Sequence, residues 1–349
     1  MYKYILGIES SCDETSAAVV EDGKKLLSNV VASQISTHTK YGGVVPEVAS
    51  RMHVESIIPV IEEALEKADI NFDDVDGIAV TQGPGLIGSL LVGLASAKSL
   101  AFSLDKPLLG VNHLEAHISA IHLENDVDFP FIALIVSGGH TNLYLVKGHT
   151  EFELISKTRD DAAGEAFDKA AKALGLGYPG GVMIDKLSRS GDRTKYKFPI
   201  PFNTKKSYDF SFSGIKTSLV YFLKKNEVKN EDDLNDICAS YQESIVKSLL
   251  NKTFNATNEY DIKRVVLCGG VACNSRIREL GAEYADKNNV QLFYPSLSLC
   301  TDNAAMIATL GYYRFLDGEM SELNIGAYST IKTKIVRGQK SFSKASQPS

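Results

Sequence analysis

The sequence PLLGVNHLEAHISAIHLE, residues 107–124, joins a short apolar strand to a helix that carries two histidines. Leu108–Val111 has the composition of a strand, and Asn112 is a good cap for a helix that begins at His113. His113 and His117 are four residues apart, so they lie on one helix face about one turn from each other. This spacing predicts a rigid unit that presents two imidazoles to one metal ion, provided that a third ligand comes from elsewhere.

The histidine pair alone leaves a structural interpretation open, because two surface histidines on an amphipathic helix have the same spacing. The pattern differs from the zinc-protease motif HExxH, in which a glutamate directly follows the first histidine and acts as general base. Leu114 stands at that position. Glu115 lies about 200° around the helix from His113, and we expect it to complete a capping box with Asn112.

Composition indicates a folded protein of about two domains. The chain has 349 residues, of which 44% are hydrophobic and 23% charged, close to globular averages. No apolar run approaches the roughly 20 residues that span a bilayer, and the N-terminus has a strand pattern. We therefore expect a cytoplasmic protein with no membrane contact. The net charge of −6 argues against indiscriminate polyanion binding. Five scattered cysteines without a CxxC pair indicate reduced thiols.

The chain has two halves that begin in the same way. Lys3–Ile8 and Ser16–Val20 are predicted strands joined by the polar turn ESSCDET, which contains three carboxylates. Phe131–Val146 repeats this plan, with the turn SGGHT between two strands. Each turn is either a simple connection or a loop that approaches phosphate or metal. The repeated plan predicts a two-lobed α/β nucleotide-binding fold with both turns facing the cleft.

Glycine-rich turns follow two further strands. TQGPGLIGS, residues 81–89, precedes a predicted helix at Leu90–Phe102, although it lacks the Lys-Ser/Thr of a P-loop. GGVACN, residues 269–274, follows the predicted strand Arg264–Leu267, and Asn274 is able to hydrogen-bond an adenine or a ribose. These turns are suited to close approach of a nucleotide.

Three acidic residues allow two interpretations each. Asp168 and Asp185 lie on predicted helices on either side of a Gly-Pro-Gly-Gly-type turn, where solvated helix charge is the simpler interpretation. Asp302 falls in the predicted first turn of an Ala-rich helix, where an acidic residue is usually a cap or a dipole partner. In a two-lobed fold it could instead meet His113 and His117 across the cleft.

The segment 192–225 is basic and aromatic. Cations that neutralise phosphate and rings that stack on unpaired bases are typical of an RNA-binding surface. Loops packed on a lobe would have a similar composition, and the sequence does not separate the two. The residues concerned are Arg193, Lys195, Tyr196, Lys197, Phe198, Phe202, Lys205, Lys206, Tyr208, Phe210, Phe212, Lys216, Lys224 and Lys225.

Seven motifs in this order resemble those of the TsaD family. That family belongs to the superfamily of actin, sugar kinases and heat-shock chaperone ATPases. The resemblance covers about residues 3–330 and leaves the basic tail outside. The motifs are ESSCDET (9–15), NHLEAH (112–117), VSGGHT (136–141), DDAAGEAFDKAAKALGLGYPGG (160–181), FSFSGIKT (210–217), GGVACN (269–274) and TDNAAM (301–306).

The resemblance implies an α/β, two-lobed fold, actin-like and sugar-kinase-like, with a βββαβα-type core in each lobe. We expect lobe I to comprise residues 1–130 plus 300–330, with the metal-binding helix and a partner face. Lobe II would comprise residues 131–299, with the adenylate site and the basic insert 192–225. Residues 331–349 have the composition of a disordered basic tail.

The resemblance also implies a reaction. The threonylcarbamoyl group of threonylcarbamoyl-AMP would pass to the exocyclic amine of the adenosine 3′ of the anticodon, in tRNAs that read codons beginning with A, with release of AMP. The implied metal ligands are His113, His117 and Asp302, and the family uses Fe²⁺, although Zn²⁺ binds the same donor set. The implied donor contacts are Ile135, Val136, Ser137, Gly138, Gly139, Asp168, Gly181, Asp185 and Asn274.

The amine must lose a proton, and Asp13 or Glu14 on the first turn is the candidate general base. The implied partners are tRNA, a TsaB-type paralogue that pairs through the first lobe, and a TsaE-type ATPase through which ATP and Mg²⁺ would act. Three other function classes compete with this one, of which a metalloprotease fails on the missing HExxH glutamate. An ATP-using kinase or ATPase of the same superfamily would have no use for the histidine pair, and a non-catalytic scaffold would need neither metal nor adenylate.

Overall fold

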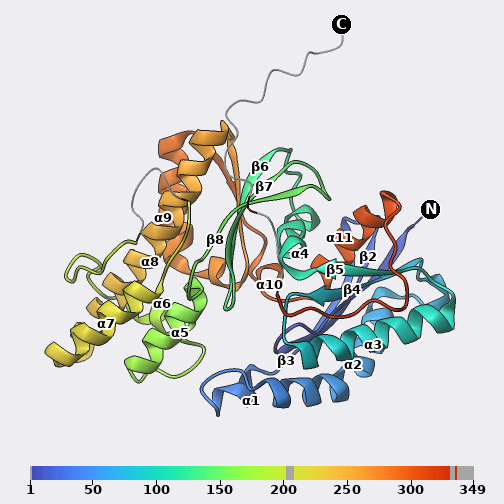
Figure 1. Cartoon of the computed structure of the whole chain (residues 1–349), viewed down its shortest axis with the longest axis horizontal. Helices are drawn as coiled ribbons and strands as arrows, with labels where there is room; N and C mark the ends of the chain where they lie inside the picture. The colour runs from blue at the N-terminus through green and yellow to red at the C-terminus, as the bar shows by residue number, and fades with distance from the viewer. Residues whose placement is uncertain (1, 202–207, 331–334, 336–349) are drawn as a thin grey trace, which may run out of the picture.

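The computed structural model describes residues 2–201, 208–330 and 335 and contains two five-stranded sheets flanked by helices (Figure 1). Their strand orders are β3-β2-β1-β4-β5 and β8-β7-β6-β9-β10, which correspond strand for strand. The predicted two-lobed α/β fold is therefore confirmed. The tail predicted to be disordered lies, except for Ile335, outside the described residues, as do Phe202, Lys205 and Lys206.

The first sheet begins with an antiparallel meander, and two parallel strands extend it. The predicted first hairpin is confirmed, with Tyr4 opposite Glu21 and Glu9 opposite Ser16. The third strand, which the βββαβα-type core implied without bounds, follows a hairpin turn at Asp22 and Gly23, both of which have positive φ. The strands are β1 (Tyr4–Glu9), β2 (Glu14–Glu21), β3 (Lys25–Ser33), β4 (Gly77–Gly83) and β5 (Leu108–Asn112).

Alternate residues of β1 pack on opposite faces of this sheet. Leu6 and Ile8 contact α2 (Pro46–Ala68) and α3 (Ile87–Leu104), whereas Ile5 faces α11 (Ala304–Leu316). The period of two along a strand explains this division. Helix α3 begins at Ile87, earlier than the predicted Leu90. Helix α2 has proline at its first position, where a helix N–H has no partner within the helix.

Helix α3 is 18 residues long with a mean hydropathy of 1.6, so it could cross a membrane by length and composition alone. The expectation that no segment has these properties was therefore wrong. Leu90, Leu94 and Ala97 of α3 are buried, and Leu94 and Ala97 pack against the first sheet. In this fold α3 is a core helix.

The second sheet repeats the first. It consists of β6 (Phe131–Val136), β7 (Thr141–Val146), β8 (Phe152–Lys157), β9 (Arg264–Cys268) and β10 (Gln291–Phe293). One face is covered by α5 (Ala163–Ala173), α6 (Gly180–Ser188), α7 (Ser213–Lys225), α8 (Glu231–Tyr260) and α9 (Ser275–Asn288). The remaining short helices are α1 (Ile35–Thr39), η1 (Phe72–Asp74), η2 (Ala120–Leu123), η3 (Gly270–Cys273) and α10 (Leu297–Cys300).

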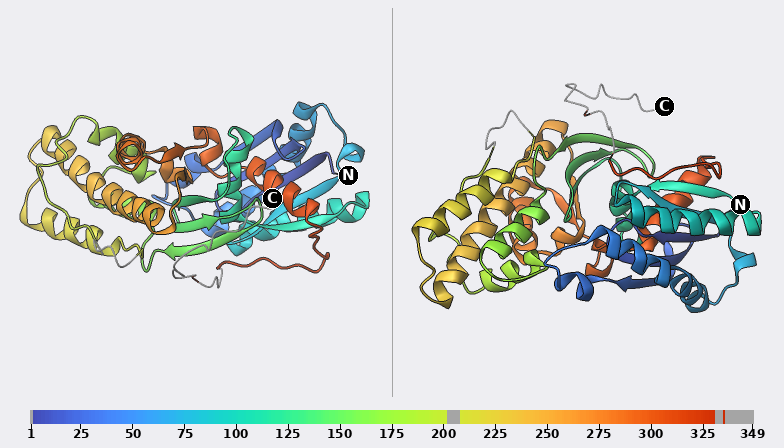
Figure 2. Two further views of the ribbon diagram at one scale, coloured as in Figure 1. Left: turned by 90° about the horizontal axis from the view of Figure 1, so that it is seen from above. Right: turned by 60° about the horizontal axis from the view of Figure 1, so that its bottom comes forward.

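Helix α4 (His113–Ser119) lies between the two halves of an elongated molecule (Figure 2). Leu114 and Ile118 pack on the second sheet, in a core that includes Phe131 and Ile135. Ala116 belongs to the core on the α11 side of the first sheet. The helix with the two histidines is therefore held by both halves.

The described part of the segment 192–225 is packed on the second lobe. Phe210 and Phe212 are fully buried, so they are not available to stack on bases. Lys195 forms an ion pair with Asp236 at 2.7 Å. For the two phenylalanines the RNA-stacking interpretation was wrong, and the alternative of packing on a lobe is correct.

A buried histidine lies where the chain crosses between the halves. The His122 ring of η2 contacts Phe129 and His149, at centroid distances of 5.4 and 4.5 Å. Burial, with a contribution from His149, lowers the pKa of His122 to about 3 from its usual 6.5. The folded protein therefore holds this imidazole neutral.

We expect the free energy of unfolding to fall as pH decreases below about 6.5, because the unfolded chain then binds a proton that folded His122 excludes. The contribution of one such group is at most about 1.4 kcal/mol per pH unit. Urea midpoints at about pH 7.5 and about pH 5 should differ more for the wild type than for His122→Phe, which keeps a ring that does not titrate. Equal differences would contradict this assignment.

Candidate metal centre and donor cavity

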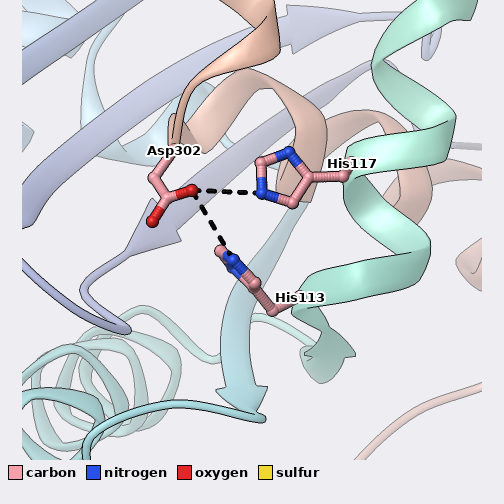
Figure 3. Close-up of side chains that lie close together, drawn as sticks. All are labelled: His113, His117 and Asp302. Carbon is pink, nitrogen blue, oxygen red and sulfur yellow. Dashed lines mark hydrogen bonds and ion pairs between the residues drawn. The ribbon is translucent and has the colours of Figure 1, made fainter. Parts of the chain in front are cut away.

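His113, His117 and Asp302 converge at the cleft between the halves (Figure 3). The Nε2 atoms of His113 and His117 lie 3.6 and 3.1 Å from the same oxygen, Asp302 Oδ1. The three ligand atoms are within 4.8 Å of one another, and the imidazole planes are inclined by 80°. As predicted, the Asn112 side chain caps α4 by accepting a hydrogen bond from Leu114 N at 2.9 Å. Two nitrogens and one oxygen can thus bind a single cation.

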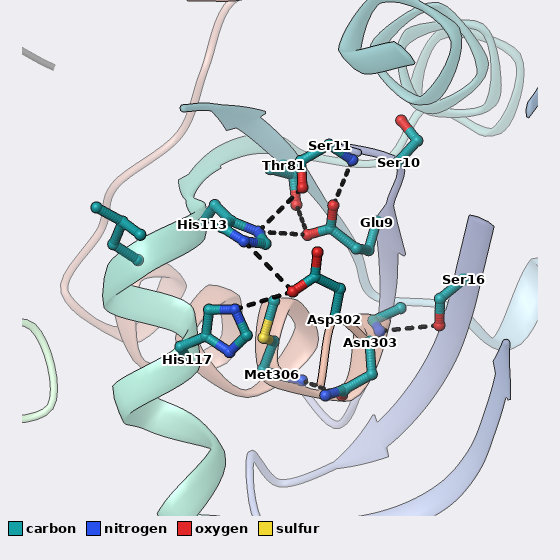
Figure 4. Close-up of polar contacts among 12 residues, drawn as sticks. Glu9, Ser10, Ser11, Ser16, Thr81, His113, His117, Asp302, Asn303 and Met306 are labelled. Carbon is teal, nitrogen blue, oxygen red and sulfur yellow. Dashed lines mark hydrogen bonds and ion pairs between the residues drawn. The ribbon is translucent and has the colours of Figure 1, made fainter. Parts of the chain in front are cut away.

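Asp302 was placed wrongly in the first turn of the last helix. It precedes Asn303, which is the N-cap of α11 and whose Oδ1 accepts a hydrogen bond from Met306 N at 3.1 Å (Figure 4). The Ala304 N–H donates to Ser16 Oγ on β2 at 2.9 Å. Because Asn303 caps the helix, the Asp302 carboxylate is available to the histidines.

Glu9 orients the His113 ring through Nδ1, the ring nitrogen that does not face Asp302. Its Oε2 lies 2.9 Å from His113 Nδ1 and accepts a hydrogen bond from Thr81 Oγ1 at 2.6 Å, while Ser11 N donates to Oε1 (Figure 4). Such a carboxylate fixes the tautomer and leaves Nε2 to the metal. Burial opposes the charged imidazole, but Glu9 and Asp302 outweigh it and raise the pKa of His113 to about 9.

The sequence analysis missed this role of Glu9. Glu9 ends β1, Thr81 lies near the end of β4, and His113 follows β5, three neighbouring parallel strands. The carboxyl ends of parallel strands meet at one sheet edge. Once these strands were assigned, this rule would have placed Glu9 next to His113.

Replacing Glu9 by glutamine should weaken metal binding by about 10–100-fold, because the fully buried amide neither carries the charge nor accepts all three hydrogen bonds. Metal titration of the apoprotein measures this effect. Glu55→Gln, at an exposed position on α2, is the matched control and should bind metal like the wild type. Unchanged affinity in Glu9→Gln would refute the orienting role.

Glu115 has a different partner from the one expected. Its carboxylate accepts a hydrogen bond from Arg314 of α11 at 2.6 Å, where the sequence predicted a capping box with Asn112. The ion pair ties α4, which carries the two histidines, to α11, which Asp302 precedes in the chain.

Beside the three candidate metal ligands lies a cavity of about 710 Å³, which we call the donor cavity. Its wall combines residues from both halves, including Asp13, Glu14, Ser137, Gly138, Gly139 and Asp168. Among the described residues, the backbone N–H groups of Gly138 and Gly139 donate no hydrogen bond. Gly164 of α5 touches this turn so closely that a Cβ there would lie 2.6 Å from Ser137 O. The turn is held rigidly with two amides available.

The other residues predicted to contact the donor do not line the donor cavity. Ile135 and Val136 are fully buried strand residues. Asp185 accepts a hydrogen bond from Ser275 Oγ at 2.7 Å, and the Asn274 side chain caps α9. Together with Gly181 these residues lie outside the wall of the donor cavity.

The solvated-charge interpretation of the two helix aspartates was wrong. Asp168 accepts a hydrogen bond from Gly180 N at 2.8 Å, at the start of α6, and Asp185 is buried. Burial raises the pKa of Asp168 although the amides of Gly180 and Gly181 oppose the shift.

The two candidate bases both line the donor cavity. Asp13 is buried, with 8% of its surface exposed. Burial, followed by the negative charges of Asp302 and Asp13, raises the pKa of Glu14 to about 10. Without a cation beside Asp302, Glu14 is therefore protonated at neutral pH.

The sequence profile of the family TsaD, tRNA N6-adenosine threonylcarbamoyltransferase, matches residues 25–309. The chain belongs to the TsaD family. A relative with this name from Syntrophus aciditrophicus (strain SB) is 58% identical over 327 residues, 93% of this chain and 96% of the relative. One from Clostridioides difficile (strain 630) is 51% identical over 329 residues, 94% and 97% of the two chains. As a TsaD-family member, the chain is a transferase that modifies tRNA.

Solved structures of distant proteins share the fold. HypF of T. kodakarensis superposes with a TM-score of 0.61 at 16% identity, over 91% of this chain and 48% of HypF. Component A of the Acidaminococcus fermentans (R)-2-hydroxyglutaryl-CoA dehydratase gives a TM-score of 0.52 at 18% identity, over 89% and 98% of the two chains. At these identities the likeness concerns the fold alone.

Proposed function

We propose that the donor cavity binds threonylcarbamoyl-AMP and that its threonylcarbamoyl group passes to the N6 amine of the adenosine 3′ of the anticodon, in tRNAs that read codons beginning with A. AMP is the leaving group. The observation that supports this most is the convergence of His113, His117 and Asp302 beside the free amides of Gly138 and Gly139.

We propose that His113, His117 and Asp302 hold one Fe²⁺, with Zn²⁺ as the alternative for the same donor set. The fit is supported by the approach of all three ligand atoms and by Glu9, which directs His113 Nε2 toward Asp302. A bound divalent cation would supply positive charge next to the phosphate and carbonyl oxygens of the donor.

The residues of the chain then have separate tasks. The amides of Gly138 and Gly139 donate hydrogen bonds to the carbonyl oxygen on which negative charge develops. Ser137 and Asp168 hold the donor from the second lobe, while Ile135 and Val136 fix the position of the turn. Asp185 and Asn274 support the adenosine end through the start of α9, which they hold in place. Gly181 supports it from the first turn of α6, where its backbone amide faces Asp168.

Attack by the amine forms the new carbon–nitrogen bond, the bond to the phosphate oxygen of AMP breaks, and the amine loses a proton. Asp13 or Glu14 accepts this proton in the proposed mechanism. Both side chains line the donor cavity, which is where the amine must meet the donor.

The proposed partners are tRNA, a TsaB-type paralogue and a TsaE-type ATPase that supplies the ATP and Mg²⁺ chemistry. The paralogue would bind lobe I, residues 1–130 plus 300–330, where α2 and α3 leave Val54, Ile58 and Leu91 more than half exposed. Lobe II would comprise residues 131–299. The proposed compartment is the cytoplasm, where tRNA is available.

The test combines the purified protein, its two partners, labelled threonylcarbamoyl-AMP and unmodified tRNA. We expect label in the adenosine 3′ of the anticodon and an equal amount of AMP. Chelation should abolish the transfer, and adding back Fe²⁺ or Zn²⁺ separately identifies the metal. Absence of label in RNA from metal-loaded protein would overturn the proposal.

A further inference from the structure

A second, smaller cavity is lined by residues of the SGGHT turn and of β7, and we call it the side cavity. Its volume is about 170 Å³, room for on the order of ten water molecules, which is close to the number of heavy atoms in a purine. Pro84, Gly139, His140 and Ser329 line both cavities. The two cavities therefore adjoin each other, and His140 belongs to the wall of both.

The His140 side chain is neither a proposed metal ligand nor a proposed donor contact nor a candidate base. Its backbone is fixed, since Ser137 N donates to His140 O at 2.9 Å and His140 N donates to Ser137 Oγ at 3.2 Å. The half-buried imidazole makes no hydrogen bond with the described residues. Burial, reinforced by His113 and His117, lowers the pKa of His140 to about 4. A neutral imidazole offers one donor and one acceptor.

The rest of the side cavity suits a base better than a sugar or a phosphate. Leu114 and Pro84 provide apolar surface, on which an unstacked base can lie. Asn142 is buried, with one amide hydrogen bond to Tyr144 Oη at 3.3 Å, and a side-chain amide pairs well with the edge of adenine. The wall contains one lysine, Lys157, and no arginine, so phosphate is a poor match.

We propose that the side cavity receives the acceptor adenine, unstacked from the anticodon loop, and that His140 hydrogen-bonds its N6 amine and directs it into the donor cavity. This inference rests on the proposed function. It adds the acceptor subsite, which neither the metal ligands nor the donor contacts define. Asn142 reads the remaining edge of the base.

The test measures binding of an anticodon stem-loop to the metal-loaded protein with its partners, without donor. Two loops are compared, one with adenine at the acceptor position and one with purine, which lacks the N6 amine. The wild type should bind the adenine loop about tenfold more tightly. His140→Phe should bind both loops equally, whereas His140→Gln, which keeps a hydrogen-bonding group, should restore part of the preference.

His149→Phe is the matched control, because it changes a histidine at the opposite end of β7 and should keep the wild-type preference. Metal content and binding of labelled threonylcarbamoyl-AMP should be unchanged in His140→Phe. Equal binding of both loops by the wild type would overturn the inference, and so would a preference retained by His140→Phe or a loss of donor binding in it. Failure of label transfer by the wild type would instead count against the proposed function.

Discussion

Replacing Asp302 by alanine should lower the rate of threonylcarbamoyl transfer to tRNA by about 10²-fold or more and abolish stoichiometric metal binding. One oxygen of Asp302 serves both imidazoles, at 3.6 and 3.1 Å. Burial opposes the charge on Asp302, but His113 and His117 hold its pKa well below the usual range. Even partners of metal ligands contribute 10–100-fold to affinity or activity, and a direct ligand should contribute at least as much.

Metal content by elemental analysis and label transfer under single-turnover conditions check this prediction together. The control is Asp232→Ala, which removes an exposed carboxylate from the start of α8 and should change neither quantity. If Asp302→Ala retains both metal and transfer, the proposed ligand set is wrong.

Gly7→Ala should destabilise the fold by about 2–3 kcal/mol and weaken metal binding at the same time. A Cβ at Gly7 on β1 would lie 2.3 Å from Ala304 O and 2.8 Å from Ala308 N. These are backbone atoms of α11, so the helix itself would have to shift. Because Asp302 directly precedes the cap of α11, the displacement reaches the metal ligands.

Urea unfolding and metal titration measure the two effects. Gly214→Ala is the matched control, because nothing lies within 4 Å of its added Cβ and the residue is in the first turn of α7. Alanine there should be neutral or slightly stabilising. A stable Gly7→Ala protein with normal metal affinity would show that α11 is not seated as rigidly as described.

Local patterns predicted much of the fold. The cap at Asn112, the histidine spacing and the two opening hairpins depend on neighbours in sequence, and the structure confirms all three. The bounds of strand β3 could also have been predicted, because the dipeptide Asp22-Gly23 is typical of a β-hairpin turn.

Other features depend on contacts that no local pattern encodes. His117 and Asp302 are 185 residues apart, and the sequence offered their meeting across the cleft as one of two interpretations until the family resemblance implied it. The expected capping box failed because Arg314, 199 residues from Glu115, provides a stronger partner. The composition of 192–225 was ambiguous because a buried phenylalanine and an exposed one look the same in sequence.

The repeated topology determines which polar groups lie on opposite walls of the donor cavity. The turns after β1 and β6 occupy equivalent positions in the two sheets and face each other across one cavity. The first presents the carboxyls of Asp13 and Glu14, and the second presents the amides of Gly138 and Gly139. The cavity therefore has carboxyl groups on one wall and N–H dipoles on the opposite wall, and we expect an elongated ligand with one anionic end to bind in one orientation.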